Sequence, residues 1–180
     1  MPVAGEAEGR ATRPPSLRVR ANALDLAIYK RVRSLARTPV SVRWVKRYSR
    51  LGEHAAVWVG GGAVAAALDR PRRARWGRAA VTVGVSYGVS TSIKMAIGRK
   101  RPAIEDLPHL MATPTGLSFP SSHATSSFAA ACAYSRLAPA GPLYAAAVAM
   151  AASRLYLGVH YPSDVAAGAA LGTLLGALGR

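Results

Sequence analysis

The sequence predicts an all-α membrane protein, in which a bundle of about five transmembrane helices follows an N-terminal amphipathic helix. Three observations carry this prediction. Five apolar stretches follow one another and are joined by short loops. Lys and Arg side chains gather in clusters beside these stretches. No segment shows the strict apolar-polar alternation that marks a β-strand.

The charge of the chain is strongly basic but uneven. The formal net charge of the 180 residues is +16, and 12 of the 24 Lys and Arg residues lie in the first 50 positions. Five more lie between Arg70 and Arg78. Basic clusters that flank apolar runs are typical of contact with a membrane surface. We therefore expect membrane lipids, and no nucleic acid, among the partners. A nucleic-acid role would instead predict salt-sensitive DNA binding by the N-terminal 50 residues.

The chain divides into three parts. Residues 1–19 are polar and contain proline, as a disordered tail does. Residues 20–50 form an amphipathic, interfacial helical segment, in which helical spacing over 21–37 aligns Leu24, Ile28 and Leu35. This helix lies on a membrane surface or packs on the protein's own core, and Pro39 marks a break after it. Residues 51–180 form the membrane core.

The core consists of the five apolar stretches. A membrane-spanning helix needs about 20 residues, and several stretches are slightly shorter, so a soluble bundle of small residues is the competing interpretation. Glycines four residues apart favour close helix packing in a membrane. They are Gly84 with Gly88, and Gly168 with Gly172 and Gly176. The stretches cover residues 51–68, 79–97, 123–137, 142–157 and 162–178.

Polar residues interrupt this apolar pattern in three places. KMAIGRKRP contains Lys94 and Arg101 near the end of the second stretch. PSSH, which ends at His123, opens the third stretch as the N-terminus of a helix, where free N–H groups favour an anion. SRLYLGVHYPSD joins the fourth stretch to the fifth and contains Arg154, His160 and Asp164.

Helix direction predicts that these three places meet. Helices that cross a layer alternate in direction, so the end of the second stretch, the start of the third, the end of the fourth and the start of the fifth share one side. Asp164 lies four residues after His160, where it can accept a hydrogen bond from one imidazole nitrogen and leave the other free to attack. The sequence therefore predicts a phosphate site. Its members are Lys94, Arg101, Ser121, Ser122, His123, Arg154, His160 and Asp164.

The order and spacing of these motifs resemble the three-part signature of the type 2 phosphatidic acid phosphatase family. The second part departs once, because Ser122 stands where the family usually has glycine. The resemblance covers roughly residues 50–180 and implies a multi-pass enzyme of the bacterial cell membrane that needs no cofactor and no metal. It implies that His160 is a nucleophile that forms a phosphohistidine, that Asp164 orients it and that His123 protonates the leaving oxygen. It also implies that Lys94, Arg101, Arg154 and the N–H groups of Ser121 and Ser122 hold the phosphate.

The expected substrate is a lipid phosphate, and the family's small bacterial members indicate a polyprenyl-linked lipid of the cell envelope, such as decaprenylphosphoryl 5-phosphoribose. Alternatives are a polyprenyl diphosphate, phosphatidic acid and phosphatidylglycerol phosphate. A non-catalytic membrane scaffold and a vanadate-dependent haloperoxidase are rivals from other classes. Arg99 and Lys100 are expected in an ordinary basic loop. Glu53 and His54 lie on the same side as the site and are expected at the membrane interface, with contact to the substrate as the alternative.

Overall fold

The computed structural model describes residues 17–35 and 37–179, and side chains from residue 20 onward. The predicted disordered tail, residues 1–19, therefore lies almost entirely outside the described residues. The described chain is helical and contains no β-strand, apart from one isolated bridge between Lys100 and Leu117. The elements are α1 (Leu17–Arg33), α2 (Pro39–Leu51), η1 (Glu53–Ala55), α3 (Ala56–Leu68), η2 (Arg70–Arg72), α4 (Arg73–Ile97), α5 (Ser122–Tyr134), α6 (Ala140–Tyr156) and α7 (Pro162–Leu178).

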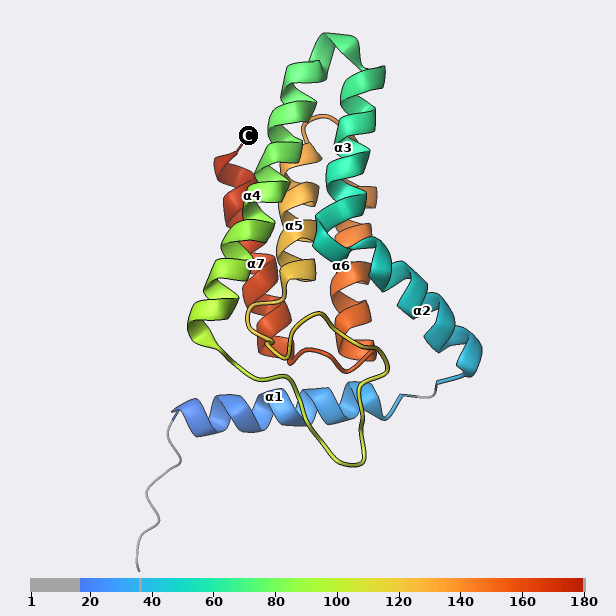
Figure 1. Cartoon of the computed structure of the whole chain (residues 1–180), viewed down its shortest axis with the longest axis vertical. Coiled ribbons are helices and arrows are strands. Elements are labelled where there is room, and N and C mark those ends of the chain that lie inside the picture. The colour runs from blue at the N-terminus through green and yellow to red at the C-terminus, as the bar shows by residue number, and fades with distance from the viewer. Residues whose placement is uncertain (1–16, 36, 180) are drawn as a thin grey trace, which may run out of the picture.

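Helices α3 to α7 form a bundle around α5 (Figure 1). Most residues of α5 are buried, because α4, α6 and α7 pack on it. Helix α1 crosses the lower end of the bundle in this view, and α2 runs obliquely from that end to α3. The all-α prediction is confirmed, and the last four apolar stretches correspond to α4, α5, α6 and α7.

The N-terminal helical segment consists of two separate helices. The helix expected over 21–37 ends at Arg33, and a second helix, α2, begins at Pro39. Thr38 caps α2: its hydroxyl accepts a hydrogen bond from the Ser41 N–H at 3.1 Å, and the Ser41 hydroxyl accepts one from the Thr38 N–H at 3.0 Å. Reciprocal capping of this kind fixes the start of a helix, so the break at Pro39 is a helix start as well as a stop.

The first apolar stretch is also bent. His54 and Ala55 adopt left-handed backbone conformations, with φ of 53° and 59°, so α3 begins only at Ala56. Within the described chain, no single helix is long and apolar enough to cross a membrane. One pair passes the same test together: Pro39–Leu51 with Glu53–Leu68, bent by 51°. The predicted count of about five spans is therefore not confirmed.

The glycine prediction holds at one helix pair and fails at another. A Cβ added to Gly168 would lie 2.6 Å from the Ser121 carbonyl oxygen, and one added to Gly176 would lie 2.7 Å from that of Ala129. Backbone contact between α7 and α5 therefore depends on these glycines. A Cβ at Gly84 or Gly88 would meet open space, so the prediction of close packing there is wrong.

Candidate active site

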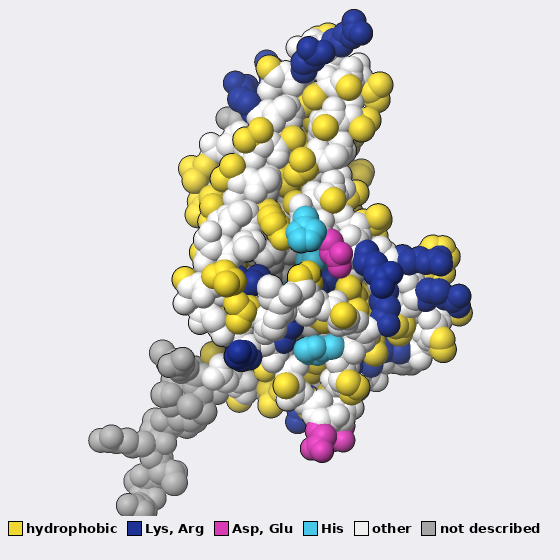
Figure 2. Space-filling view, viewed as in Figure 1, with side chains coloured by type: hydrophobic (Ala, Val, Ile, Leu, Met, Phe, Trp, Pro, Cys, Tyr) yellow, Lys and Arg dark blue, Asp and Glu magenta, His cyan; other side chains and the backbone are white. Residues whose placement is uncertain are grey.

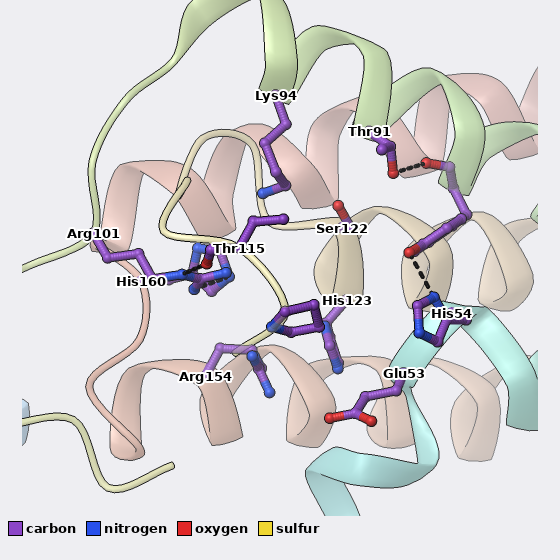
Figure 3. A pocket seen from close by; sticks show the side chains of 12 residues that line it. Glu53, His54, Thr91, Lys94, Arg101, Thr115, Ser122, His123, Arg154 and His160 are labelled. Carbon is purple, nitrogen blue, oxygen red and sulfur yellow. Dashed lines mark hydrogen bonds between the residues drawn. The ribbon is translucent and has the colours of Figure 1, made fainter. Parts of the chain in front are cut away.

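The predicted polar residues meet at one end of the bundle, around a cavity of about 80 Å³ (Figure 3). The end of α4, the start of α5 and the end of α6 surround this cavity, together with the loop that precedes α7. This arrangement agrees with the predicted alternation of helix direction. The lining residues are Glu53, His54, Tyr87, Thr91, Lys94, Arg101, Pro114, Thr115, Ser122, His123, Arg154 and His160.

Three cations line the cavity and are held in place by neighbouring groups. Lys94 Nζ donates to the carbonyl oxygens of Ser118 and Pro120, at 3.1 and 2.6 Å. Arg101 donates from Nε to the Thr115 carbonyl at 2.9 Å and from Nη1 to the Val159 carbonyl at 2.5 Å.

Arg154, the third cation, is 2% exposed and donates from Nη1 to the Ser49 hydroxyl. Its buried Nε has no partner among the described residues. Three fixed positive charges of this kind form a preorganised site for a phosphoryl group.

His160 lies beside these cations with one ring nitrogen free of hydrogen. Arg101 Nη1 lies 3.2 Å from His160 Nε2. A guanidinium can only donate, so Nε2 accepts, and the proton of a neutral ring is on Nδ1. Nε2 is therefore the unprotonated nitrogen of the ring, and its lone pair accepts from Arg101.

The charge state of His160 agrees with this role. The residue precedes α7 and is 1% exposed. Burial, and then the positive charges of Arg101, Arg154 and Lys94, lower the pKa of His160 well below its ordinary value of 6.5. The imidazole is therefore neutral at physiological pH. Burial also lowers the pKa of Arg101, to about 10, which leaves its guanidinium charged.

Asp164 approaches the other side of the ring but does not contact it alone. Its Oδ2 lies 3.6 Å from His160 Nδ1, which is long for a hydrogen bond. The Ser118 hydroxyl lies 3.3 Å from Nδ1 and donates to Asp164 Oδ2. The direct contact that the spacing predicted is therefore a bridged one. Ser118 was missed because it precedes the PSSH motif and belongs to no recognised spacing.

His123 faces the same cavity from the first turn of α5. Its Nε2 lies 3.2 Å from the Ser49 carbonyl oxygen. A carbonyl only accepts, so Nε2 carries the hydrogen and Nδ1 is the nitrogen left for other contacts. Gly52 also lies against this ring, because an added Cβ would be 2.9 Å from His123 Cδ2. Ser49 and Gly52 were not predicted as site residues.

The two serines before His123 have different roles. Ser121 caps α5, with its hydroxyl accepting from the Ala124 N–H at 3.4 Å. The N–H of Ser121 donates to the Asp164 carbonyl at 2.9 Å, so this predicted phosphate donor already has a partner. Ser122 lines the cavity, and its hydroxyl accepts from Ser90 at 2.9 Å. The N–H groups of Ser122 and His123, in the first turn, have no intrahelical carbonyl partner.

Arg99 corrects the expectation of an ordinary basic loop. Its Nη1 lies 2.8 Å from Asp164 Oδ1, and its Nη2 lies 2.8 Å from Asp25 Oδ2. Asp25, on α1, is 6% exposed and also accepts from the Ser163 N–H at 2.8 Å. A chain of ionic contacts thus joins α1 to Asp164. A sequence signal existed, because Asp25 is the only acidic residue between Arg10 and Leu51.

Glu53 and His54 line the cavity, which agrees with the alternative interpretation of these residues rather than with the favoured one, a place at the membrane interface. His54 Nδ1 lies 2.9 Å from the Tyr87 hydroxyl. The left-handed backbone at His54 costs roughly 1–3 kcal/mol in a non-glycine residue, and such strain commonly accompanies functional sites. The turn between α2 and α3 therefore belongs to the wall of the site.

The described residues offer a place for an anion. Among them, no group of three or more His, Cys, Asp or Glu side chains gathers in a way that could hold a metal ion. Lys94, Arg101 and Arg154 instead surround a cavity with a single carboxylate, Glu53, in its lining.

Comparison with known proteins agrees with this geometry. Residues 75–179 match the model of the PAP2 superfamily. A decaprenylphosphoryl-5-phosphoribose phosphatase from Mycobacterium tuberculosis (strain ATCC 25618 / H37Rv) is 40% identical over 157 residues, which are 86% of this chain and 88% of the relative. The protein of the same name from Mycolicibacterium smegmatis is 36% identical over 135 residues, 75% of each chain.

Solved structures share the fold. Aquifex aeolicus LpxE superposes with a TM-score of 0.74 at 25% identity, over 87% of this chain and 94% of that one. A PAP2-type phosphatidylglycerolphosphate phosphatase from Bacillus subtilis superposes with a TM-score of 0.74 at 24% identity, over 89% of this chain and 84% of that one. A bacterial vanadium-dependent iodoperoxidase superposes with a TM-score of 0.69 at 19% identity, over 94% of this chain and 51% of that one. The motifs, the family match and the curated relatives agree, and the chain belongs to the PAP2 superfamily.

Proposed function

We propose that the chain is a lipid phosphate phosphatase that hydrolyses a phosphomonoester on a polyprenyl-linked membrane lipid, with decaprenylphosphoryl 5-phosphoribose as the first candidate. The names of the curated relatives support this substrate. A polyprenyl diphosphate, phosphatidic acid or phosphatidylglycerol phosphate is the second choice; the Bacillus subtilis phosphatidylglycerolphosphate phosphatase shares the fold of this chain.

The proposed reaction has two displacements at phosphorus. His160 Nε2 attacks the phosphoryl group, a P–N bond forms, and the P–O bond to the lipid breaks while His123 gives a proton to the leaving oxygen. Water then attacks the phosphohistidine, His123 takes a proton from this water, and the P–N bond breaks. Lys94, Arg101, Arg154 and the first-turn N–H groups of α5 stabilise the charge on the phosphoryl oxygens throughout.

One observation carries this proposal most directly: an unprotonated nitrogen of His160 faces a small cavity that three cations line. A nucleophile and a phosphate site are thereby adjacent. The cavity is also smaller than the roughly 300–1,000 Å³ of ordinary small-molecule pockets. It therefore fits a phosphoryl group rather than a whole lipid.

The proposal includes a membrane arrangement. Residues 51–180 would form a multi-pass core in the bacterial cell membrane, with the site near one rim, and residues 20–50 would lie at the interface. The exposed apolar side chains along the bundle, such as Val64, Val81, Val148 and Leu174, support contact with lipid. Cysteine labelling from each side of sealed vesicles tests this topology.

The activity test is phosphate release by the purified chain in detergent with EDTA, over a panel of the lipid phosphates named above. We expect release from the polyprenyl-linked monoester, loss of release in His160→Ala, and an acid-labile phosphoenzyme in the unmodified protein. Unchanged release in His160→Ala would support the scaffold alternative. Vanadate-dependent halide oxidation without phosphate release would support the haloperoxidase alternative.

A further inference from the structure

The catalytic cavity continues into a groove along α2. A hollow of about 370 Å³ adjoins the cavity, and Glu53 and Pro114 line both. A second hollow, of about 670 Å³, adjoins the 370 Å³ hollow, and Lys46 and Arg50 line both of these. We call these two hollows the basic groove. Its walls are Arg37, Thr38, Pro39, Val42, Arg43, Lys46, Arg47, Arg50 and Glu53 on one side, and residues 110–114 on the other.

The sequence of α2 places positive charge on this groove. Arg43, Lys46, Arg47 and Arg50 follow spacings of three and four residues, so they share one face of the helix. Figure 2 shows the Lys and Arg side chains gathered over α2, beside the centre of the molecule where the histidines lie. Lys46 and Arg50 belong to both hollows, and they are the cations that line the hollow adjoining the cavity.

Three of these cations have no ionic partner in the part of the chain that the structure describes. Among the described residues, no carboxylate lies within ion-pair distance of Arg43, Lys46 or Arg50. Two other cations of the groove have partners of another kind. Arg37 donates to main-chain carbonyls of α1, and Arg47 lies over the Trp44 ring at 5.1 Å. Unpaired cations that line a concave surface attract an external anion.

The size of the catalytic cavity indicates that the anion in the basic groove is part of the same substrate. At about 80 Å³ it holds the phosphoryl group that is removed, so the rest of the substrate must leave through an opening. Glu53 and Pro114 form the wall that the cavity shares with the basic groove, and any second phosphate on a substrate that follows this path reaches Lys46 and Arg50.

We propose that the basic groove is a second anion site, in which Lys46 and Arg50 bind the phosphodiester that the substrate retains while its terminal phosphate occupies the catalytic cavity. This rests on the proposed function. It defines the substrate class as lipids that carry a phosphodiester as well as the phosphomonoester that is removed. Glu53 lines both the cavity and the adjoining hollow, so its carboxylate separates the two anion sites.

The test compares two substrates in neutral detergent without anionic lipid: a polyprenyl-linked lipid with both phosphates, and a lipid with one phosphomonoester. In Lys46→Gln/Arg50→Gln we expect KM for the first substrate to rise about tenfold, the effect of losing hydrogen bonds to a charged group, with kcat within about twofold. KM for the second should change less than twofold. The matched control is Arg75→Gln/Arg78→Gln, which removes two cations on α4 far from the site and should change neither substrate.

Each other result has a distinct meaning. If the unmodified protein hydrolyses neither substrate, the proposed function fails. If it hydrolyses both and the variant affects both equally, the second anion site is overturned while the phosphatase stands. A third arm adds anionic phospholipid vesicles. A variant effect that appears only in this arm assigns the groove to bilayer headgroups and also overturns the proposal.

Discussion

Helices α1 and α2 are adjacent in sequence, and both precede the residues that match the family, but they contact opposite halves of the site. Helix α1 contacts the half that contains His160 and Asp164. Its Asp25 reaches Asp164 through Arg99, and its Tyr29 hydroxyl donates to the Gly158 carbonyl at 3.1 Å. The N-terminal segment is therefore part of the site's support rather than an appendage.

Helix α2 contacts the half that contains His123 and Arg154. Ser49, which is fully buried, accepts from Arg154 with its hydroxyl and from His123 with its carbonyl. The comparison shows that His160 and His123, the two histidines that we propose as catalytic, have separate supports. Substitutions should therefore disturb nucleophilic attack and leaving-group protonation independently.

The largest expected effect lies in the α2 half. His123→Ala should lower kcat for the lipid phosphate about 10²–10⁴-fold, the usual contribution of a general acid. An aryl phosphate with a good leaving group needs little protonation, so its hydrolysis should fall far less. Steady-state kinetics on both substrates checks this. Equal losses would assign His123 to phosphate binding instead.

The α1 half provides the next effect. Arg99→Leu removes the link between Asp25 and Asp164 and should lower kcat about 10–100-fold, as loss of an outer contact to a functional group commonly does. The loss should be the same for lipid and aryl phosphates, because it acts on His160. Arg75→Leu is the matched control. If Arg99→Leu retains full activity, the α1 support has no catalytic role.

A smaller effect should separate the two contacts of Ser49. Ser49→Ala removes the hydroxyl that holds Arg154 but keeps the carbonyl that holds His123, so we expect KM to rise about tenfold for both lipid and aryl phosphates. Ser34→Ala, at an exposed serine of the α1 end, should change nothing. A loss confined to the lipid phosphate would mean that the substitution acts through His123.

Substitution on the outer face of α1 should change activity least. Leu24 and Ile28 are 62% and 40% exposed, and they point away from the buried Asp25 and Tyr29. Leu24→Ser/Ile28→Ser should change kcat by no more than about twofold, as surface substitutions generally do. Hydrogen exchange of α1 in lipid vesicles should become faster, because apolar contact with the interface is lost. Unchanged exchange would argue against membrane contact by this face.

The pH dependence of activity tests the charge state of His160 without any substitution. The nucleophile must be neutral, and burial with neighbouring cations lowers the pKa of His160 well below 6.5. On the acid side, activity should therefore be lost as pH falls through that lowered value, so the acid limb of kcat/KM lies below pH 6.5. An acid limb above pH 6.5 would contradict a neutral, buried nucleophile.

The sequence predicted the residues that line the site better than the residues that hold them in place. The motifs that contain Lys94, Arg154 and His160 could be placed together because alternating helices leave few choices of side. Ser49, Ser118 and Arg99 could not be found in this way. Their contacts depend on how α1, α2 and the loop before α5 pack, and helical spacing alone does not determine that packing. The same packing decides which face of α1 is buried: Asp25 and Arg33 face the protein, while Leu24 and Ile28 are exposed, as a helix on a membrane surface would have them.

The glycines of α7 have a consequence for how such an enzyme can diversify. Because the backbones of α5 and α7 touch, any larger residue at Gly168 or Gly176 would force apart the helices that hold His123 and Asp164. The reaction geometry is thus fixed by the seam, meaning the α5–α7 contact at Gly168 and Gly176, where almost no substitution is tolerated. New specificities must arise where no such constraint applies, on α2 and on the loop opposite it, so relatives with different headgroup preferences should vary there while the seam stays the same.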